Sequence, residues 1–261
     1  MKVLILGNSQ DTGTFVAEEA KRQYRIREQL AAEFGEPVEI AVRNVWPSER
    51  MVNYVMRSVD EERPDLVYVN VTNYPYAYES LPLRVQRIFG KAGKPVGDAG
   101  MKLADSRRWS HNAAFRALRR FGQATIGGDT HFTPEQVIER YSELIRTLLR
   151  HEGTAVAVKG PMGKSRAATG RQRARAEAKR AKVHGALKSL CLQLHVYYAG
   201  SDTPAYVTSP PRKGTSVGDG LHSNAIGHQI SAEDHFPLIR DAWREHVALS
   251  SPASAERARG S

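Results

Sequence analysis

The 261-residue chain is predicted to fold as an α/β protein, a three-layer α/β/α sandwich in which helices cover both faces of a parallel sheet. Short apolar runs of strand length alternate along the chain with longer segments of helical composition and periodicity. The content of 41% hydrophobic and 25% charged residues is typical of a globular protein, and the length suffices for one domain with a sizeable core.

The individual elements follow from local patterns. The apolar run 3–6 indicates a short buried strand, and the segment 14–34, rich in Ala, Glu, Gln and Arg, indicates the helix after it. Thr133 suits a helix N-cap and Pro134 suits a first turn, so a helix is expected from there to about residue 151. The other expected elements are strands at 38–42, 66–71, 155–158, 196–198 and 205–208, and helices at 51–62, 110–121, 165–194 (with a break at Gly170 or Gly185 left open) and from about Pro237 to Leu249.

The net charge of +10 is concentrated in one segment. Between Lys159 and Lys188 there are ten Lys or Arg residues and one acid, Glu177, so this stretch alone carries about +9. We interpret residues 159–195 as a basic helical insertion in a single domain, 1–249, which is followed by a disordered polar tail, 250–261. The insertion is either a solvated helix, for instance a lid over the site, or a surface that binds nucleic acid or another polyanion.

The chain has the features expected of a cytoplasmic protein. Its one cysteine, Cys191, excludes an internal disulfide and fits a reducing compartment. No apolar run approaches the roughly 18 residues that a membrane span needs, and only four apolar residues follow Lys2, which is too few for the core of a secretory signal.

Three residues far apart in the sequence have the chemistry of a serine hydrolase. Ser9 stands on the turn directly after the first strand, in the crevice where parallel sheets bind ligands. A serine hydroxyl needs a base to accept its proton, and that base needs a third group to fix its tautomer. His222 and Asp219 are three residues apart, which allows the carboxylate to reach the imidazole Nδ1 while Nε2 faces Ser9.

Three segments resemble conserved blocks of one enzyme family. Ile5–Gln10 resembles the first block of the SGNH (GDSL-like) hydrolases, in which the serine follows a strand directly. Asp219–His228 resembles the last block, whose Asp-x-x-His carries the other two triad members. Pro64–Asn73 resembles the third block, in which a strand ends in Gly-x-Asn. The resemblance implies a flavodoxin-like sheet.

The resemblance also implies a role for each matching residue. Ser9 would attack the acyl carbon, His222 would accept and return the proton, and Asp219 would orient His222. The Ser9 backbone N–H and the Asn73 side chain would stabilise the oxyanion. The implied activity is hydrolysis of a carboxylic ester, of esterase or deacetylase type, in a small-molecule or glycoside substrate, with no metal or organic cofactor.

Parts of the sequence depart from the family pattern. Val71 stands where the third block has Gly, and Tyr74 stands where it often has Asp. The segment Asn44–Glu49 occupies the place of the second block without any Gly, so the second backbone donor is either Ser48 or Glu49. These departures leave open the alternative of a catalytically weak scaffold that binds polyanions. An acyltransferase is a further alternative, because an acyl-enzyme can pass its acyl group to a small alcohol acceptor instead of water.

Four further residues are candidates for substrate binding. Asn8 and Gln10 flank Ser9, whereas Tyr74 and Tyr76 follow Asn73 and either wall the cleft or pack inside the fold.

Two other features have a less specific interpretation. Gly160–Ser165 resembles a phosphate-binding loop, but Val158 stands where that motif needs Gly and Pro161 lacks an N–H, so we interpret the segment as a turn at a strand end. His228, Asp234 and His235 are expected on the surface around the last helix.

Overall fold

The computed structural model describes residues 1–13, 15–90, 127–151, 153–161, 170–200, 214–217 and 222–250, with a few isolated positions between these ranges. The expected strand 205–208, Asp219 and the tail after residue 250 lie outside the described part of the chain, as does most of the expected helix 110–121.

The centre of the molecule is a parallel sheet of five strands in the order β2-β1-β3-β4-β5. The strands are β1 (Lys2–Gly7), β2 (Glu39–Asn44), β3 (Leu66–Asn70), β4 (Ala155–Lys159) and β5 (Tyr197–Ala199). The helices are α1 (Ser9–Thr12), the short 3-10 helix η1 (Glu18–Ala20), α2 (Arg22–Phe34), α3 (Met51–Glu62), α4 (Tyr74–Ala77), residues 81–90, α8 (Pro134–Leu148), α9 (Gly170–Gln193) and α10 (Ala225–Ser250).

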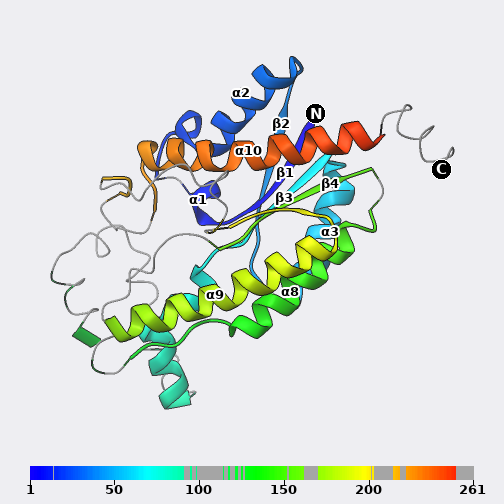
Figure 1. The fold of residues 1–261 in the computed structure, drawn as a ribbon. Coiled ribbons are helices and arrows are strands. Elements are labelled where there is room, and N and C mark those ends of the chain that lie inside the picture. Colours follow the sequence, from blue (N-terminus) through cyan, green and yellow to red (C-terminus); the bar gives the residue numbers. More distant parts are fainter. Residues whose placement is uncertain are drawn as a thin grey trace.

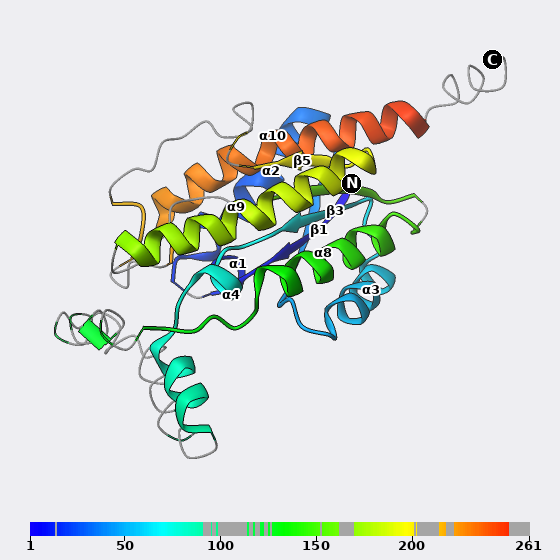
Figure 2. The ribbon, with the colours of Figure 1, turned by 60° about the horizontal axis from the view of Figure 1, so that its bottom comes forward.

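Helices cover both faces of this sheet (Figure 1, Figure 2). Along β1, Leu4 and Leu6 pack into the core shared with α3, α8 and α9, whereas Val3 and Ile5 pack into the core shared with α2 and α10. Both sets are buried because successive side chains of a strand point to opposite faces. The predicted three-layer α/β/α fold is therefore confirmed.

Two helices begin at different residues than expected. The helix expected from residue 14 is α2, which begins only at Arg22. The chain from Phe15 to Lys21 forms a loop and the 3-10 turn η1 instead. The last helix begins at Ala225 and contains Pro237 in its interior. The expectation that Pro237 opens this helix was wrong, since the turns that precede it pack His228, Ala232 and His235 against the sheet.

The basic helix α9 connects β4 to β5, two neighbouring parallel strands. Val183, Leu187 and Leu190 form a stripe at helical spacing that is buried in the core with α8. Gly185 does not interrupt the helix. The segment expected as a solvated insertion is thus, in its described part, the crossover helix of the sheet. Among the described helices none is long and apolar enough to cross a membrane.

We predict that Thr133→Ala lowers the free energy of unfolding by about 1 kcal/mol, measured by urea denaturation. The Thr133 hydroxyl accepts the Gln136 N–H (3.3 Å), and the Gln136 side chain accepts the Thr133 N–H (2.9 Å), so both groups cap α8. Thr147→Ala on the same helix is the matched control, because the Thr147 hydroxyl donates to the Glu143 carbonyl one turn earlier and caps no helix end. An equal loss in both variants would contradict the capping role.

Candidate active site

The turn that carries Ser9 is stabilised by a reciprocal pair of helix-capping hydrogen bonds. The Asn8 side chain accepts the Gln10 N–H (2.8 Å), and the Asp11 carboxylate accepts the Asn8 N–H (3.0 Å). A Cβ on Gly7 would lie 2.1 Å from this carboxylate, so only glycine fits at the end of β1. The cap leaves Ser9 exposed at the first position of α1.

The structure brings His222 to this turn from 213 positions away. Its Nε2 lies 3.3 Å from the Ser9 Oγ, within hydrogen-bonding reach. The ring of Phe15 stacks on the imidazole, with centroids 3.8 Å apart and planes inclined by 18°. The Gln10 side chain accepts the Ser223 N–H (2.8 Å), which ties the histidine loop to the serine turn.

The predicted oxyanion residues follow the two strands on either side of β1. Asn73 follows β3 and Ser48 follows β2, so both lie at the carboxyl edge of the sheet, as Ser9 does. Figure 2 shows α1 and α4 at this same end of the sheet. The Tyr76 hydroxyl donates to the Asn73 Oδ1 (3.4 Å). The Ser48 N–H donates to the Trp46 carbonyl (2.7 Å), which leaves Glu49 as the alternative backbone donor.

The candidate substrate residues differ in position. Tyr74 is exposed, whereas Tyr76 is completely buried in the hydrophobic core. A direct contact of Tyr76 with substrate does not agree with this placement, because apolar burial drives its ring away from solvent. Asn8 and Gln10 flank Ser9, and each uses a side-chain oxygen to hold the turn or its neighbouring loop.

Solved structures with the same architecture are known at low sequence identity. TesA superposes with a TM-score of 0.57 at 12% identity over 93% of this chain and 99% of that chain. The psychrotrophic esterase EstA from Pseudoalteromonas sp. has a TM-score of 0.52 at 9% identity, covering 92% and 97%. A protein from Desulfitobacterium hafniense DCB-2 assigned to the lipolytic G-D-S-L family has a TM-score of 0.51 at 10% identity, covering 91% and 98%.

This chain has the SGNH hydrolase fold. No protein-family model and no curated protein matches the sequence.

Beneath the serine turn, the SGNH fold of this chain contains a buried ion pair that the sequence did not reveal. Asp11 and Arg22 are 1% and 6% exposed, and the Arg22 guanidinium binds both carboxylate oxygens of Asp11. Arg22 also reaches helix α10, since its Nη1 donates to Ser231 (3.2 Å) and its backbone N–H donates to the His228 Nδ1 (3.3 Å). One arginine therefore connects the serine turn to the helix that follows the His222 loop. The Asn8-x-x-Asp11 spacing signals the cap, but no local pattern points to Arg22.

His228 and His235 belong to this buried cluster, so the expectation that they lie on the surface was wrong. The Arg22 Nη1 lies 3.4 Å from the His235 Nε2. Burial, reinforced by the positive charge of Arg22, lowers the pKa of His228 to about 4. Burial, reinforced by the charges of Lys159 and Arg22, holds the pKa of His235 well below its usual value. Desolvation likewise lowers the pKa of the buried Lys159 amine to about 7. Both histidines are neutral at pH 7.

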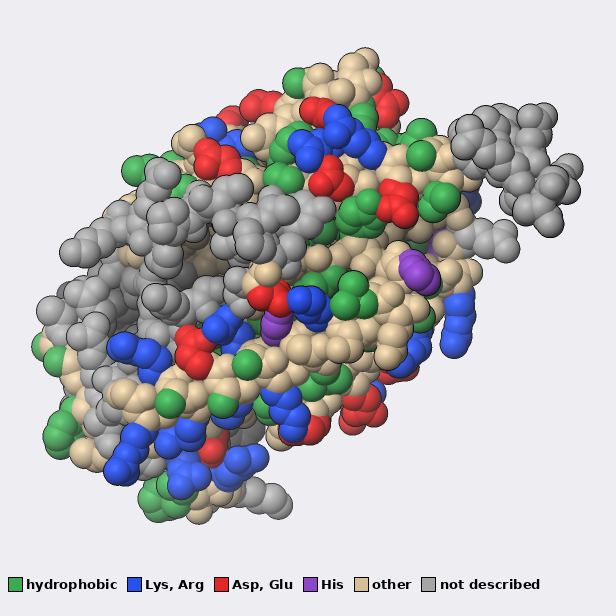
Figure 3. Space-filling view, viewed as in Figure 1, with side chains coloured by type: hydrophobic (Ala, Val, Ile, Leu, Met, Phe, Trp, Pro, Cys, Tyr) green, Lys and Arg blue, Asp and Glu red, His purple; other side chains and the backbone are tan. Residues whose placement is uncertain are grey.

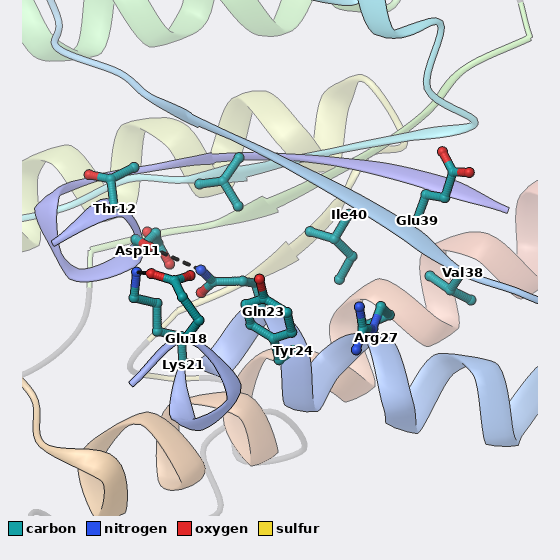
Figure 4. Close-up of a pocket in the computed structure, with 11 residues that line it drawn as sticks. Asp11, Thr12, Glu18, Lys21, Gln23, Tyr24, Arg27, Val38, Glu39 and Ile40 are labelled. Atoms are coloured by element: carbon teal, nitrogen blue, oxygen red, sulfur yellow. Dashed lines mark hydrogen bonds and ion pairs between the residues drawn. The ribbon is translucent and has the colours of Figure 1, made fainter. Parts of the chain in front are cut away.

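A groove of about 660 Å³ lies beside this cluster, between α2 and the edge strand β2. Figure 4 shows Asp11 and Thr12 at one end, Gln23, Tyr24 and Arg27 from α2, and Ile40 from β2. Neither Ser9 nor His222 lines this groove. The groove is therefore separate from the Ser9–His222 pair.

The described residues hold neither a metal-binding cluster nor a reactive thiol. No group of three or more His, Cys, Asp or Glu residues is placed to hold a metal within the described part of the chain. Burial raises the pKa of the Cys191 thiol to about 12, so this cysteine is a core residue.

The basic surface over α9 is partly neutralised by acids. In Figure 3 blue side chains gather near the end at which α9 begins, with few red ones among them. Four of its cations form ion pairs: Arg175 with Glu79, Arg180 with Glu177, Lys182 with Glu135 and Lys188 with Asp202. These four pairs reduce the charge that their cations can offer to phosphates.

Proposed function

We propose that this chain is a member of the SGNH hydrolases and cleaves carboxylic esters through an acyl-enzyme on Ser9. The observation that carries the proposal is the 3.3 Å separation between the Ser9 Oγ and the His222 Nε2. Serine and histidine reach hydrogen-bonding distance from opposite ends of the chain, at the sheet edge where parallel α/β folds bind ligands. The likeness of the fold to the esterase EstA supports this class of reaction.

In this mechanism the Ser9 Oγ attacks the acyl carbon while the His222 Nε2 accepts its proton. The protonated His222 then donates that proton to the departing alkoxide, and the acyl group stays on Ser9. Water attacks the acyl-enzyme, gives its proton to His222 and releases the acid, after which Ser9 regains its proton. Asp219 is proposed to accept the Nδ1–H of His222 and support its positive charge. Stacking of Phe15 restricts the ring to the orientation that faces Ser9.

The developing oxyanion is proposed to accept hydrogen bonds from three donors: the Ser9 N–H, the Asn73 side-chain amide and a backbone N–H of the loop after β2. All three follow neighbouring parallel strands, and the Ser9 N–H stands at the start of α1. Each preorganised donor of this kind contributes on the order of 3 kcal/mol to transition-state stabilisation. An alcohol can take the place of water in the second step, so acyl transfer to a small acceptor uses the same residues.

The proposal predicts that a fluorophosphonate probe labels the wild-type protein covalently at Ser9. Ser9→Ala is expected to abolish labelling, and His222→Gln to slow it by at least about 10³-fold, because the hydroxyl loses its base. Labelling is measured by intact-protein mass spectrometry. Ser142→Ala on α8, remote from the turn, is the control and should label as the wild type does. Absence of labelling in the folded wild-type protein would refute the nucleophile.

A further inference from the structure

An exposed cluster of aromatic rings lies at the same edge of the sheet as Ser9. Trp46 is at its centre, with ring centroids 5.1 Å from His131, 5.7 Å from Phe132 and 6.1 Å from Tyr74. Tyr78 stacks on Tyr74 at 5.0 Å. We call these five residues the aromatic wall.

The aromatic wall is anchored beside the serine turn. Trp46 follows β2 and Tyr74 follows β3, and these strands flank β1, which ends at the Ser9 turn. The Val45 N–H donates to the Gly7 carbonyl (3.0 Å), so the residue before Trp46 is bonded to the residue before Asn8. The same two loops carry the proposed oxyanion donors. The rings therefore lie at the edge of the sheet where a substrate would approach Ser9.

The wall combines exposure with rigidity. Trp46 and Tyr74 are 40% and 42% exposed, which is a large exposed fraction for rings of this size. Edge-to-face contacts with His131 and Phe132 hold Trp46 in place. Burial lowers the pKa of His131, so its ring is neutral at pH 7 and none of the five side chains is charged. Such a surface suits an uncharged flat ring rather than an ionic or flexible group.

We propose that the aromatic wall binds a flat ring in the substrate, so that the preferred esters carry an aromatic or pyranose ring beside the scissile bond. The inference rests on the proposed ester hydrolase function and adds the substrate class. Aromatic and sugar rings share the apolar face that stacks on tryptophan, and stacking contributes about 0.5–1.5 kcal/mol per ring pair.

The test compares ester pairs that differ only in the ring. Benzyl acetate is measured against hexyl acetate, and an acetylated methyl glucopyranoside against an acetylated open-chain polyol, with acid release followed at constant pH. Wild-type kcat/KM is expected to be higher for at least one ring-bearing ester. Trp46→Ala should lower kcat/KM for that ester about 3- to 10-fold, with less than a twofold change for its acyclic partner. Comparison of the benzyl ester with the glucopyranoside ester identifies whether the preferred ring is aromatic or a sugar.

Tyr54→Ala is the matched control, because Tyr54 is also exposed but lies on α3, away from the wall. Tyr54→Ala should leave the kcat/KM of each ring-bearing ester, relative to that of its acyclic partner, unchanged. If Trp46→Ala lowers the values for ring-bearing and acyclic esters equally, or changes neither, the wall is only structural and the inference fails.

A binding measurement separates this inference from the catalytic proposal. In the Ser9→Ala protein, which cannot turn over, the preferred ring-bearing ester is expected to change tryptophan fluorescence in a saturable manner. The change should disappear in Ser9→Ala/Trp46→Phe. Saturable binding together with an unlabelled wild-type protein would refute the hydrolase and retain the ring site. A labelled wild-type protein without ring-dependent binding or selectivity would refute the ring site alone.

Discussion

Replacement of Arg22 by Gln is expected to lower the free energy of unfolding by about 3–5 kcal/mol. The guanidinium binds both oxygens of Asp11, and the carboxylate is almost completely buried. Removal of the arginine leaves that carboxylate without its counter-charge in a site from which water is excluded. Urea denaturation measures the loss. The double variant Asp11→Asn/Arg22→Gln should recover part of it, because no unpaired charge then remains inside the protein.

A second ion pair of helix α2 serves as the control. Arg244 of α10 binds Glu33 of α2, but at an exposed position. Arg244→Gln should therefore cost less than about 1 kcal/mol. A similar loss of unfolding free energy in Arg22→Gln and Arg244→Gln would show that burial does not determine how much the Arg22 pair stabilises the protein.

The Arg22 variants also test whether the pair positions Ser9. Because Asp11 accepts the Asn8 N–H and Arg22 contacts α10, loss of the pair should slow fluorophosphonate labelling in the folded protein more than Arg244→Gln does. An unchanged labelling rate in folded Arg22→Gln would limit the pair to a role in stability.

Protonation of His228 is expected to lower the free energy of unfolding by about 2 kcal/mol as the pH decreases from 7 to 5. Its pKa is about 4 in the folded protein, against an ordinary value of 6.5, so the unfolded chain binds protons first in this interval. The contribution is fully present above pH 6.5 and is lost as the pH falls through the folded value. His235, whose pKa is also lowered, adds to the loss in the same direction. Protonation would also remove the Nδ1 lone pair that accepts the Arg22 N–H.

Urea titrations at intervals between pH 5 and 7.5 measure this dependence while most carboxylates remain ionised. His228→Asn keeps an acceptor near the Nδ1 position and should flatten the curve. His195→Asn is the control, because His195 is exposed and its left-handed backbone (φ 54°) tolerates Asn. A pH dependence that is unchanged in His228→Asn would contradict the assignment.

Local signals predicted much of the fold. Helix α3 spans the expected residues 51–62, and α8 begins at the expected cap, Thr133. Both depend on interactions within a few residues, namely the periodicity of apolar side chains and the Thr-Pro pair. The beginnings of α2 and α10 could not be predicted in this way. Tertiary packing selects them, and it keeps Pro237 inside a helix although the local preference places proline at a first turn.

The sequence also predicted the serine and histidine of the candidate site, but it did not predict the residues that position or surround them. Ser9 and His222 are recognisable because a serine after a strand and a histidine in an Asp-x-x-His segment carry known chemistry. Arg22 and His228 resemble ordinary residues of amphipathic helices until packing removes them from water. Trp46, Tyr74 and His131 are separated by dozens of residues and have no shared motif.

The sequence by itself determined the alternation of strands and helices, the parallel sheet and the identity of the serine and histidine, because these depend on residue type and short-range spacing. Only the tertiary structure decided that these two side chains meet at 3.3 Å, that Asp11 and Arg22 are buried below them, and that rings from three loops form a wall beside them. The physical reason is that burial and long-range contacts depend on how the layers pack together, and a short stretch of sequence carries no information about that packing.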